Sequence, residues 1–99
     1  MSIEEEIFML PTSGKVIVDC YADWCGPCKR IAPYFEELKN DNKGVLFLKC
    51  DIDENAEFAK KYMISSIPAF ITFIDGKESS RLVGADKSKL KELVDKLRD

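Results

Sequence analysis

The stretch WCGPC, residues 24–28, contains two cysteines separated by a Gly-Pro pair. It follows KVIVDCY, residues 15–21, which is β-branched and apolar on both faces, as expected of a buried central strand. Residues 26–42 then carry apolar positions at helical spacing, which predicts a helix. Cys25 and Cys28 therefore lie at a strand-to-helix junction. A pair at this place can bind a metal ion, form a structural disulfide or carry out redox chemistry.

A zinc site is the first of these alternatives. Structural zinc usually has four Cys or His ligands that come as two separated pairs. The chain has four cysteines and no histidine, and the other two cysteines, Cys20 and Cys50, occur singly within apolar segments. Two ligands cannot complete a tetrahedral site, so we predict no metal site.

Composition and charge restrict the class of protein and its partners. Ninety-nine residues suit a single domain spanning 1–99, and 45% hydrophobic with 33% charged residues is typical of a globular protein. A net charge of −3 without a Lys/Arg cluster argues against nucleic-acid binding. No apolar run reaches the roughly 18 residues of a membrane helix, and MSIEEE does not resemble a signal peptide. We therefore expect a cytoplasmic protein, in a reducing compartment where structural disulfides are rare.

The other elements alternate between helix and strand. Ser2 and Glu5 have capping-box spacing at the start of a short first helix that ends before Pro11, although residues 6–10 could instead form a strand. Further along we expect a strand at residues 45–50 and a helix that begins at 53–55. These are followed by a hairpin of two strands, 69–74 and 77–83, and by a last helix that begins at residue 86. This order predicts an α/β fold with a mixed four-stranded sheet and helices on both of its faces.

Redox chemistry has positive support from the position of the two cysteines. Cys25 falls at the first turn of the expected helix, where free backbone N–H groups and the helix dipole favour a thiolate. A thiol with a lowered pKa is a nucleophile near neutral pH. Cys28 lies one turn further on and can resolve a mixed disulfide. Pro27 is tolerated near a helix start and stiffens the link between the sulfurs.

The chain resembles the thioredoxin family over nearly its whole length. The resemblance is carried by VDCYADWCGPCKRIAP at 18–33, SIP at 66–68, DG at 75–76 and VGA at 83–85. It implies a thioredoxin fold and a protein-disulfide reductase in which Cys25 attacks and Cys28 resolves. It also implies that no cofactor is bound, and that a thioredoxin reductase returns the Cys25–Cys28 disulfide to the dithiol with electrons from NADPH.

The resemblance also implies roles for residues outside the motif. Asp19 would be a buried acid that helps to deprotonate Cys28, with Lys49 as its partner. Pro68 would be a cis-proline beside the cysteines, and Ile67 would bind an extended substrate through its backbone. The surface that contacts the substrate would comprise Trp24, Gly26, Pro27, Ile67, Pro68, Val83, Gly84 and Ala85.

Each of these roles has an ordinary structural alternative. Asp19 and Lys49 can be solvated residues of strand ends, and Trp24 and Val83 can be core residues. Two other functions also stay open. The chain can be a non-catalytic thioredoxin-like subunit, although the presence of both motif cysteines argues against this function. It can also be a disulfide isomerase or oxidase, although the Gly-Pro pair between the cysteines argues against that function.

Two consequences concern the sheet. Thioredoxins usually begin with a strand before the first helix, whereas here the match begins at that helix, so we expect four strands and an exposed edge at 45–50. Such an edge is a route to association, and we expect mostly a monomer with weak dimerisation. If Asp19 and Lys49 share one face of adjacent strands, side-chain alternation puts Cys20 and Cys50 together on the other face as buried thiols.

Overall fold

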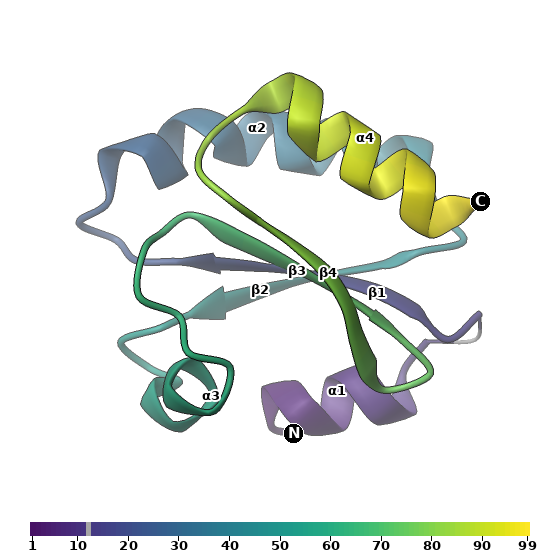
Figure 1. Ribbon diagram of the computed structural model, residues 1–99, viewed down its shortest axis with the longest axis horizontal. Helices are drawn as coiled ribbons and strands as arrows, with labels where there is room; N and C mark the ends of the chain where they lie inside the picture. The colour runs from purple at the N-terminus through teal and green to yellow at the C-terminus, as the bar shows by residue number, and fades with distance from the viewer. Residues whose placement is uncertain (12) are drawn as a thin grey trace.

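The computed structural model describes residues 1–11 and 13–99. A central sheet lies between two helices on one face and two on the other (Figure 1). The elements are α1 (Ile3–Met9), β1 (Lys15–Tyr21), α2 (Gly26–Asp41), β2 (Leu46–Asp51), α3 (Ala56–Lys61), β3 (Ala69–Ile74), β4 (Lys77–Val83) and α4 (Lys87–Arg98). The predicted order of elements is confirmed.

The first element is a helix, so the alternative strand over residues 6–10 is wrong. The Ser2 side chain accepts a hydrogen bond from the Glu5 N–H, and the Glu5 carboxylate accepts one from the Ser2 N–H, both at 3.1 Å. This capping box satisfies two backbone donors at the helix start. Ile3 and Ile7 then bury one side of α1 against the sheet.

The sheet has four strands in the order β2-β1-β3-β4, which confirms the predicted arrangement. β1 runs parallel to β2 and antiparallel to β3, and β3 pairs antiparallel with β4. Within residues 1–11 and 13–99, no strand pairs with the outer edge of β2. β2 begins one residue later than predicted, because the Val45 N–H donates to the Asn42 carbonyl and so belongs to the preceding turn.

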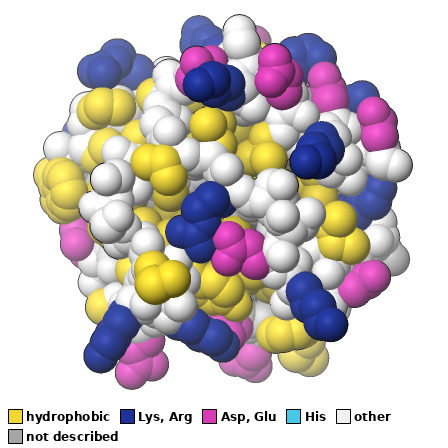
Figure 2. Space-filling view, in the orientation of Figure 1, with side chains coloured by type: hydrophobic (Ala, Val, Ile, Leu, Met, Phe, Trp, Pro, Cys, Tyr) yellow, Lys and Arg dark blue, Asp and Glu magenta, His cyan; other side chains and the backbone are white. Residues whose placement is uncertain are grey.

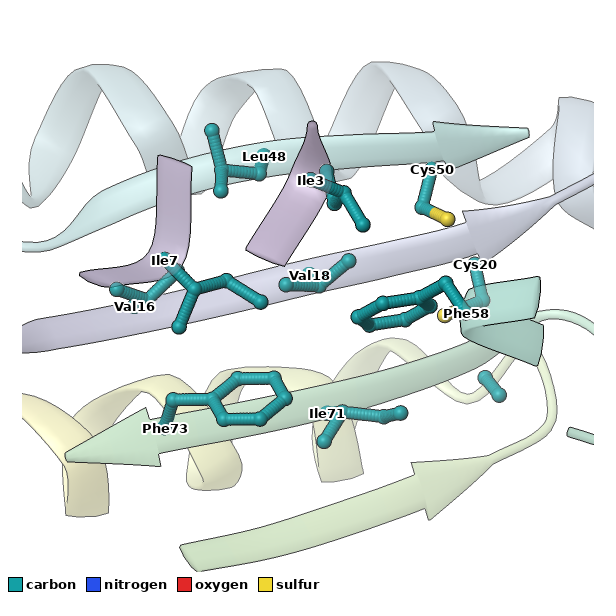
Figure 3. Close-up of a cluster of buried hydrophobic side chains, with 11 residues drawn as sticks. Ile3, Ile7, Val16, Val18, Cys20, Leu48, Cys50, Phe58, Ile71 and Phe73 are labelled. Atoms are coloured by element: carbon teal, nitrogen blue, oxygen red, sulfur yellow. The ribbon is translucent and has the colours of Figure 1, made fainter. Parts of the chain in front are cut away.

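Each face of the sheet has its own buried cluster. One cluster lies between the sheet and the α1/α3 side, where Phe58 of α3 joins Val18, Ile71 and Phe73 from the strands (Figure 3). The other cluster lies between the sheet and the α2/α4 side (Figure 1), where Phe35 of α2 packs with Leu90 of α4 and Phe70 of β3. Both faces of β1 are therefore covered, as its continuous apolar sequence predicts. Residues near the ends of β1 consequently stand between two packed layers.

Cys20 and Cys50 belong to the α1/α3 cluster. They are partners in the parallel register of β1 with β2, and both side chains are fully buried (Figure 3). Their predicted placement on one face, opposite to that of Asp19 and Lys49, follows from this register. The hydrogen bond with the Cys50 thiol and burial raise the pKa of the Cys20 thiol. A raised pKa keeps the Cys20 thiol neutral near pH 7.

Charged side chains of both signs share the surface of the molecule (Figure 2). Figure 2 shows basic and acidic side chains intermixed over the face in view, rather than gathered into a patch of one sign. Across the described part of the chain, no helix combines the length and the apolar character needed to cross a bilayer.

Candidate functional site

The junction between β1 and α2 holds the two motif cysteines. Cys25 is the N-cap residue of α2, and its Sγ accepts a hydrogen bond from the Cys28 N–H at 3.2 Å. Gly26 and Pro27 form the first turn, where proline's missing N–H costs no helical hydrogen bond. Cys25 and Cys28 are joined by a disulfide with their Cα atoms 5.3 Å apart. The predicted pair therefore exists as one redox unit.

The disulfide lies in an apolar setting at the edge of the core. Cys25 is 5% exposed and Cys28 is 4% exposed, so exposure alone does not distinguish the two sulfurs. They pack with Ala22, and Tyr21 and Ile67 border the cluster. Position along the helix does distinguish them, because only Cys25 stands at the N-cap.

The electrostatics of this helix start favour negative charge on Cys25. The 16 residues of α2 direct a helix dipole toward it, and the first turn contains no acidic residue. Lys29 and Arg30 follow on the next turn and add positive charge. An anion at the N-cap sulfur also accepts the backbone N–H of Cys28, which has no partner within the helix.

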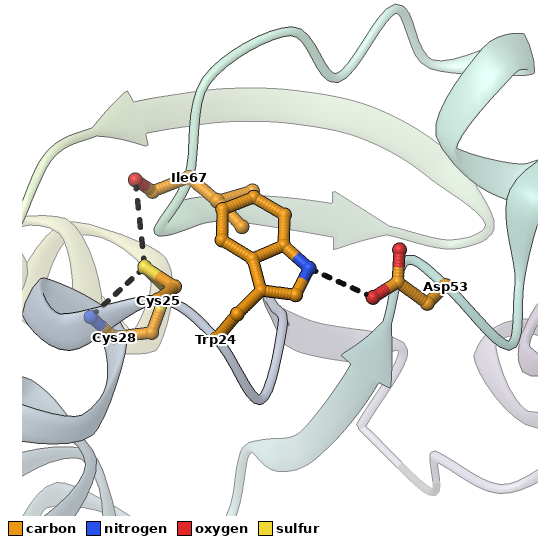
Figure 4. Close-up of a disulfide and its surroundings, with 5 residues drawn as sticks. All are labelled: Trp24, Cys25, Cys28, Asp53 and Ile67. Atoms are coloured by element: carbon orange, nitrogen blue, oxygen red, sulfur yellow. Dashed lines mark hydrogen bonds between the residues drawn. A yellow bond between two sulfur atoms is a disulfide. The ribbon is translucent and has the colours of Figure 1, made fainter.

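The start of β3 and the end of β4 meet beside the disulfide. The Ile67–Pro68 peptide is cis, and the Ile67 carbonyl oxygen lies 3.9 Å from the Cys25 Sγ (Figure 4). Pro68 is buried, and its carbonyl accepts a hydrogen bond from the Gly84 N–H at 2.9 Å. Gly84 has a φ of +114°, a conformation that side-chain-bearing residues rarely adopt. These contacts bring Ile67, Pro68 and Gly84 together with the disulfide.

Trp24 and Val83 lie on the surface around this point. Trp24 is 70% exposed and Val83 is 54% exposed, so the alternative that they are core residues is wrong. The Trp24 Nε1–H donates to the Asp53 carboxylate at 2.9 Å (Figure 4), and the Asp53 N–H donates to the Asp51 side chain at 2.9 Å. Asp53 was not singled out from the sequence, because it lies 29 positions after Trp24 and no local pattern links the two residues.

Asp19 lies in the interior of the sheet. Its side chain is only 1% exposed, and Oδ1 has no hydrogen-bond partner among the described residues. Burial raises the pKa of this carboxyl to about 6, Lys49 partly opposes the shift, and Glu36 adds to it. A buried carboxyl with a free acceptor oxygen and a pKa near neutrality is suited to exchange a proton.

Lys49 stands opposite Asp19 in the register of β1 with β2, but its side chain is exposed. Its ammonium nitrogen lies 4.5 Å from the centroid of the Tyr21 ring, a cation–π contact. The ion pairs found among the described residues do not include one between Lys49 and Asp19. Lys49 therefore acts on Asp19 through its charge at a distance rather than by direct contact.

Metal ligands are not gathered anywhere in the described part of the chain: no group of three or more His, Cys, Asp or Glu side chains could hold an ion. The chemistry available at the junction is that of two sulfurs, one buried carboxyl and the surrounding backbone. This set can accept and return two electrons through its disulfide.

Comparisons with known proteins point to one family. The family model described as Thioredoxin matches residues 4–97. A thioredoxin of Mycoplasmoides gallisepticum is 47% identical over 87 residues, which cover 87% of this chain and 87% of that protein.

Solved structures agree with this match. The solution structure of oxidised thioredoxin from Plasmodium falciparum has a TM-score of 0.87 at 40% identity, covering 99% of this chain and 94% of that one. The crystal structure of Malassezia sympodialis thioredoxin has a TM-score of 0.90 at 33% identity, with coverages of 99% and 89%. Both similarities extend across the junction that holds Cys25 and Cys28.

Proposed function

The chain belongs to the thioredoxin family and is a thiol–disulfide oxidoreductase that works through Cys25 and Cys28, and from this premise we propose its catalytic cycle. The Cys25 thiolate attacks one sulfur of a protein disulfide, forms a mixed disulfide and releases one substrate thiolate. The Cys28 thiolate then attacks the Cys25 sulfur, which releases the second substrate thiolate. The substrate gains two electrons and takes up two protons, and the chain becomes the Cys25–Cys28 disulfide.

One observation carries the assignment of the two roles. Cys25 is the N-cap of α2, and its sulfur accepts the Cys28 N–H at 3.2 Å. A thiolate is stabilised by that bond and by the helix dipole, whereas Cys28, inside the first turn, lacks the N-cap position. Cys25 is therefore the attacking sulfur and Cys28 the resolving one.

Asp19 is proposed as the proton acceptor for Cys28. Its buried carboxyl has a pKa raised to about 6, so near neutral pH it is largely ionised and can take a proton from a thiol. Lys49 limits the rise of that pKa through its charge and so keeps Asp19 in the accepting form. Both residues act in the second step, when Cys28 has to become a thiolate.

The surface around the disulfide is proposed to bind the substrate chain. An extended substrate would pair with the backbone at Ile67, in the manner of an added strand, next to the cis-proline Pro68. Exposed apolar side chains such as Trp24 and Val83 would contact its flanks. The whole proposed surface comprises Trp24, Gly26, Pro27, Ile67, Pro68, Val83 and Gly84.

The proposal extends to the cellular setting. A thioredoxin reductase using NADPH would regenerate the dithiol, which places the protein in electron transport and cell redox homeostasis. We propose a cytoplasmic location, a setting in which the free thiols of Cys20 and Cys50 are usual. Residues 1–99 would act as one domain, mostly monomeric, with weak association through the outer edge of β2 that sedimentation velocity across a concentration series would detect.

Turnover tests the proposed function directly. The protein is mixed with insulin, NADPH and a thioredoxin reductase, and NADPH oxidation is followed together with precipitation of the insulin chains. We expect multiple turnovers for the wild type and none for the Cys25→Ser and Cys28→Ser variants. Stoichiometric reduction of insulin by the pre-reduced protein, without turnover, would contradict the reductase proposal alone. Failure of both measurements would contradict disulfide reduction itself.

A further inference from the structure

A groove lies between α2 and the start of α4. Its volume is about 510 Å³, and it is lined by Arg30, Ile31, Ala85 and Lys87. Ile31 is buried and Ala85 exposed, and together they supply apolar lining, whereas Arg30 and Lys87 are both exposed cations. The groove therefore combines an apolar surface with two positive charges.

This groove adjoins the disulfide. The Arg30 guanidinium lies over the first turn of α2, where its Nη1 is 3.4 Å from the position that a Cβ on Gly26 would take. On the other side, Ala85 directly follows Gly84, whose N–H donates to the Pro68 carbonyl. A polypeptide bound beside Cys25 would therefore place its neighbouring side chains within reach of the groove.

The two cations are not neutralised by the fold. The ion pairs among the described residues involve neither Arg30 nor Lys87. The Lys87 ammonium instead lies 5.7 Å from the centroid of the Tyr34 ring on α2. Asp86, next in sequence, accepts the Lys89 N–H as the N-cap of α4 and does not line the groove.

Charge complementarity identifies the occupant. The chain as a whole has a net charge of −3, so two unpaired cations at the rim of the reactive disulfide are not part of a general positive excess. A carboxylate on a short methylene stem matches both parts of the groove, because the stem contacts Ile31 and Ala85 while the charge meets Arg30 and Lys87.

We propose that this groove binds an Asp or Glu side chain of the substrate polypeptide, and so selects protein disulfides that have an acidic residue near the attacked cysteine. The inference rests on the proposed function and adds a substrate class to it. Exposed ion pairs contribute modestly, so each cation should raise kcat/KM for an acidic substrate about two- to five-fold. Salt should weaken this preference, because the Debye length is only about 8 Å at physiological ionic strength.

The test uses disulfide-linked peptide pairs that are identical except for one residue, Glu or Gln, placed in turn at each of the three positions on either side of the cysteine. The wild-type protein should reduce at least one Glu peptide about five-fold or more faster than its Gln counterpart at low salt. Lys87→Glu should reduce this Glu-to-Gln ratio, and Arg30→Glu with Lys87→Glu should invert it. Lys77→Glu is the matched control, because it makes the same charge change at the far end of β4 and should leave the ratio unchanged.

The outcomes separate the two claims. If the wild type reduces all the peptides with equal kcat/KM, the groove proposal is overturned while disulfide reduction stands. If Lys77→Glu lowers the Glu-to-Gln ratio as much as Lys87→Glu does, the preference comes from the net charge of the protein, and the groove proposal is overturned. If the wild type reduces no peptide, disulfide reduction itself is contradicted, and the groove proposal that rests on it is contradicted as well.

Discussion

Replacing Asp19 with asparagine tests what the buried carboxyl of β1 costs the fold. Asp19 is almost fully buried and its Oδ1 has no hydrogen-bond partner in the described part of the chain. An ionised carboxylate at such a site is costly, since water is lost without full compensation. Asparagine has nearly the same shape and carries no charge at any pH. The variant therefore removes the cost of ionisation and keeps the volume.

The size of the effect follows from the pKa. Folding raises the Asp19 pKa from an ordinary 3.8 to about 6, and burial is the main cause. The folded state therefore holds a proton that the unfolded state has released between these values, so stability falls as the pH rises through this window. The difference of about 2 units corresponds to about 3 kcal/mol, almost fully present as a penalty above pH 7 and nearly absent below about pH 3.

Urea denaturation of the oxidised protein from pH 4 to pH 8 measures this penalty. The free energy of unfolding of Asp19→Asn, relative to wild type, should rise by about 2.5 kcal/mol across the series. The slope of this difference against pH separates the cost of ionisation from the cost of a buried amide, because burying an amide without partners shifts the whole curve by a constant amount. Glu37→Gln, an exposed position on α2, is the control and should give a flat difference. An equally flat difference for Asp19→Asn would refute the buried-carboxylate account.

Three further predictions follow from the packing and the helix ends. In the reduced protein, Cys25 should alkylate with iodoacetamide well below pH 8 and Cys28 much more slowly, as read by mass spectrometry; equal rates would contradict the assigned roles. Cys20 and Cys50 should react with a thiol reagent only after denaturation, and rapid labelling of the native protein would contradict their burial. Ser2→Ala should lower the free energy of unfolding by about 1 kcal/mol through loss of the capping box, and an unchanged urea midpoint would contradict that role.

Local patterns predicted most of the fold. The spacing of Ser2 and Glu5 indicated the start of α1, and the apolar run of residues 15–21 indicated a strand covered on both faces. The two β-rich segments at 69–74 and 77–83 indicated the hairpin. These features succeed because caps, turns and buried strands depend on neighbouring residues, which a sequence displays directly.

The site was less accessible to sequence reasoning, because its contacts join distant segments. The cis peptide before Pro68 came only from the family resemblance, since trans is the ordinary state. The Trp24–Asp53 hydrogen bond and the placement of the Lys49 ammonium over Tyr21 depend on side-chain conformations that no spacing encodes. The groove that carries Arg30 and Lys87 needs α2 and α4 to be packed together before it exists.

Trapping the mixed disulfide tests the attacking role of Cys25 and the resolving role of Cys28 in a single measurement. Pre-reduced Cys28→Ser is mixed with a disulfide-linked peptide, and the products are resolved by mass spectrometry under non-reducing conditions. Without the resolving thiol, the mixed disulfide between Cys25 and one peptide should accumulate to near stoichiometric amounts and persist. The reciprocal variant, Cys25→Ser, should form little or none in the same time. If Cys25→Ser traps the peptide through Cys28 as fast as Cys28→Ser does through Cys25, then the N-cap position does not select the attacking sulfur, and the central claim is wrong.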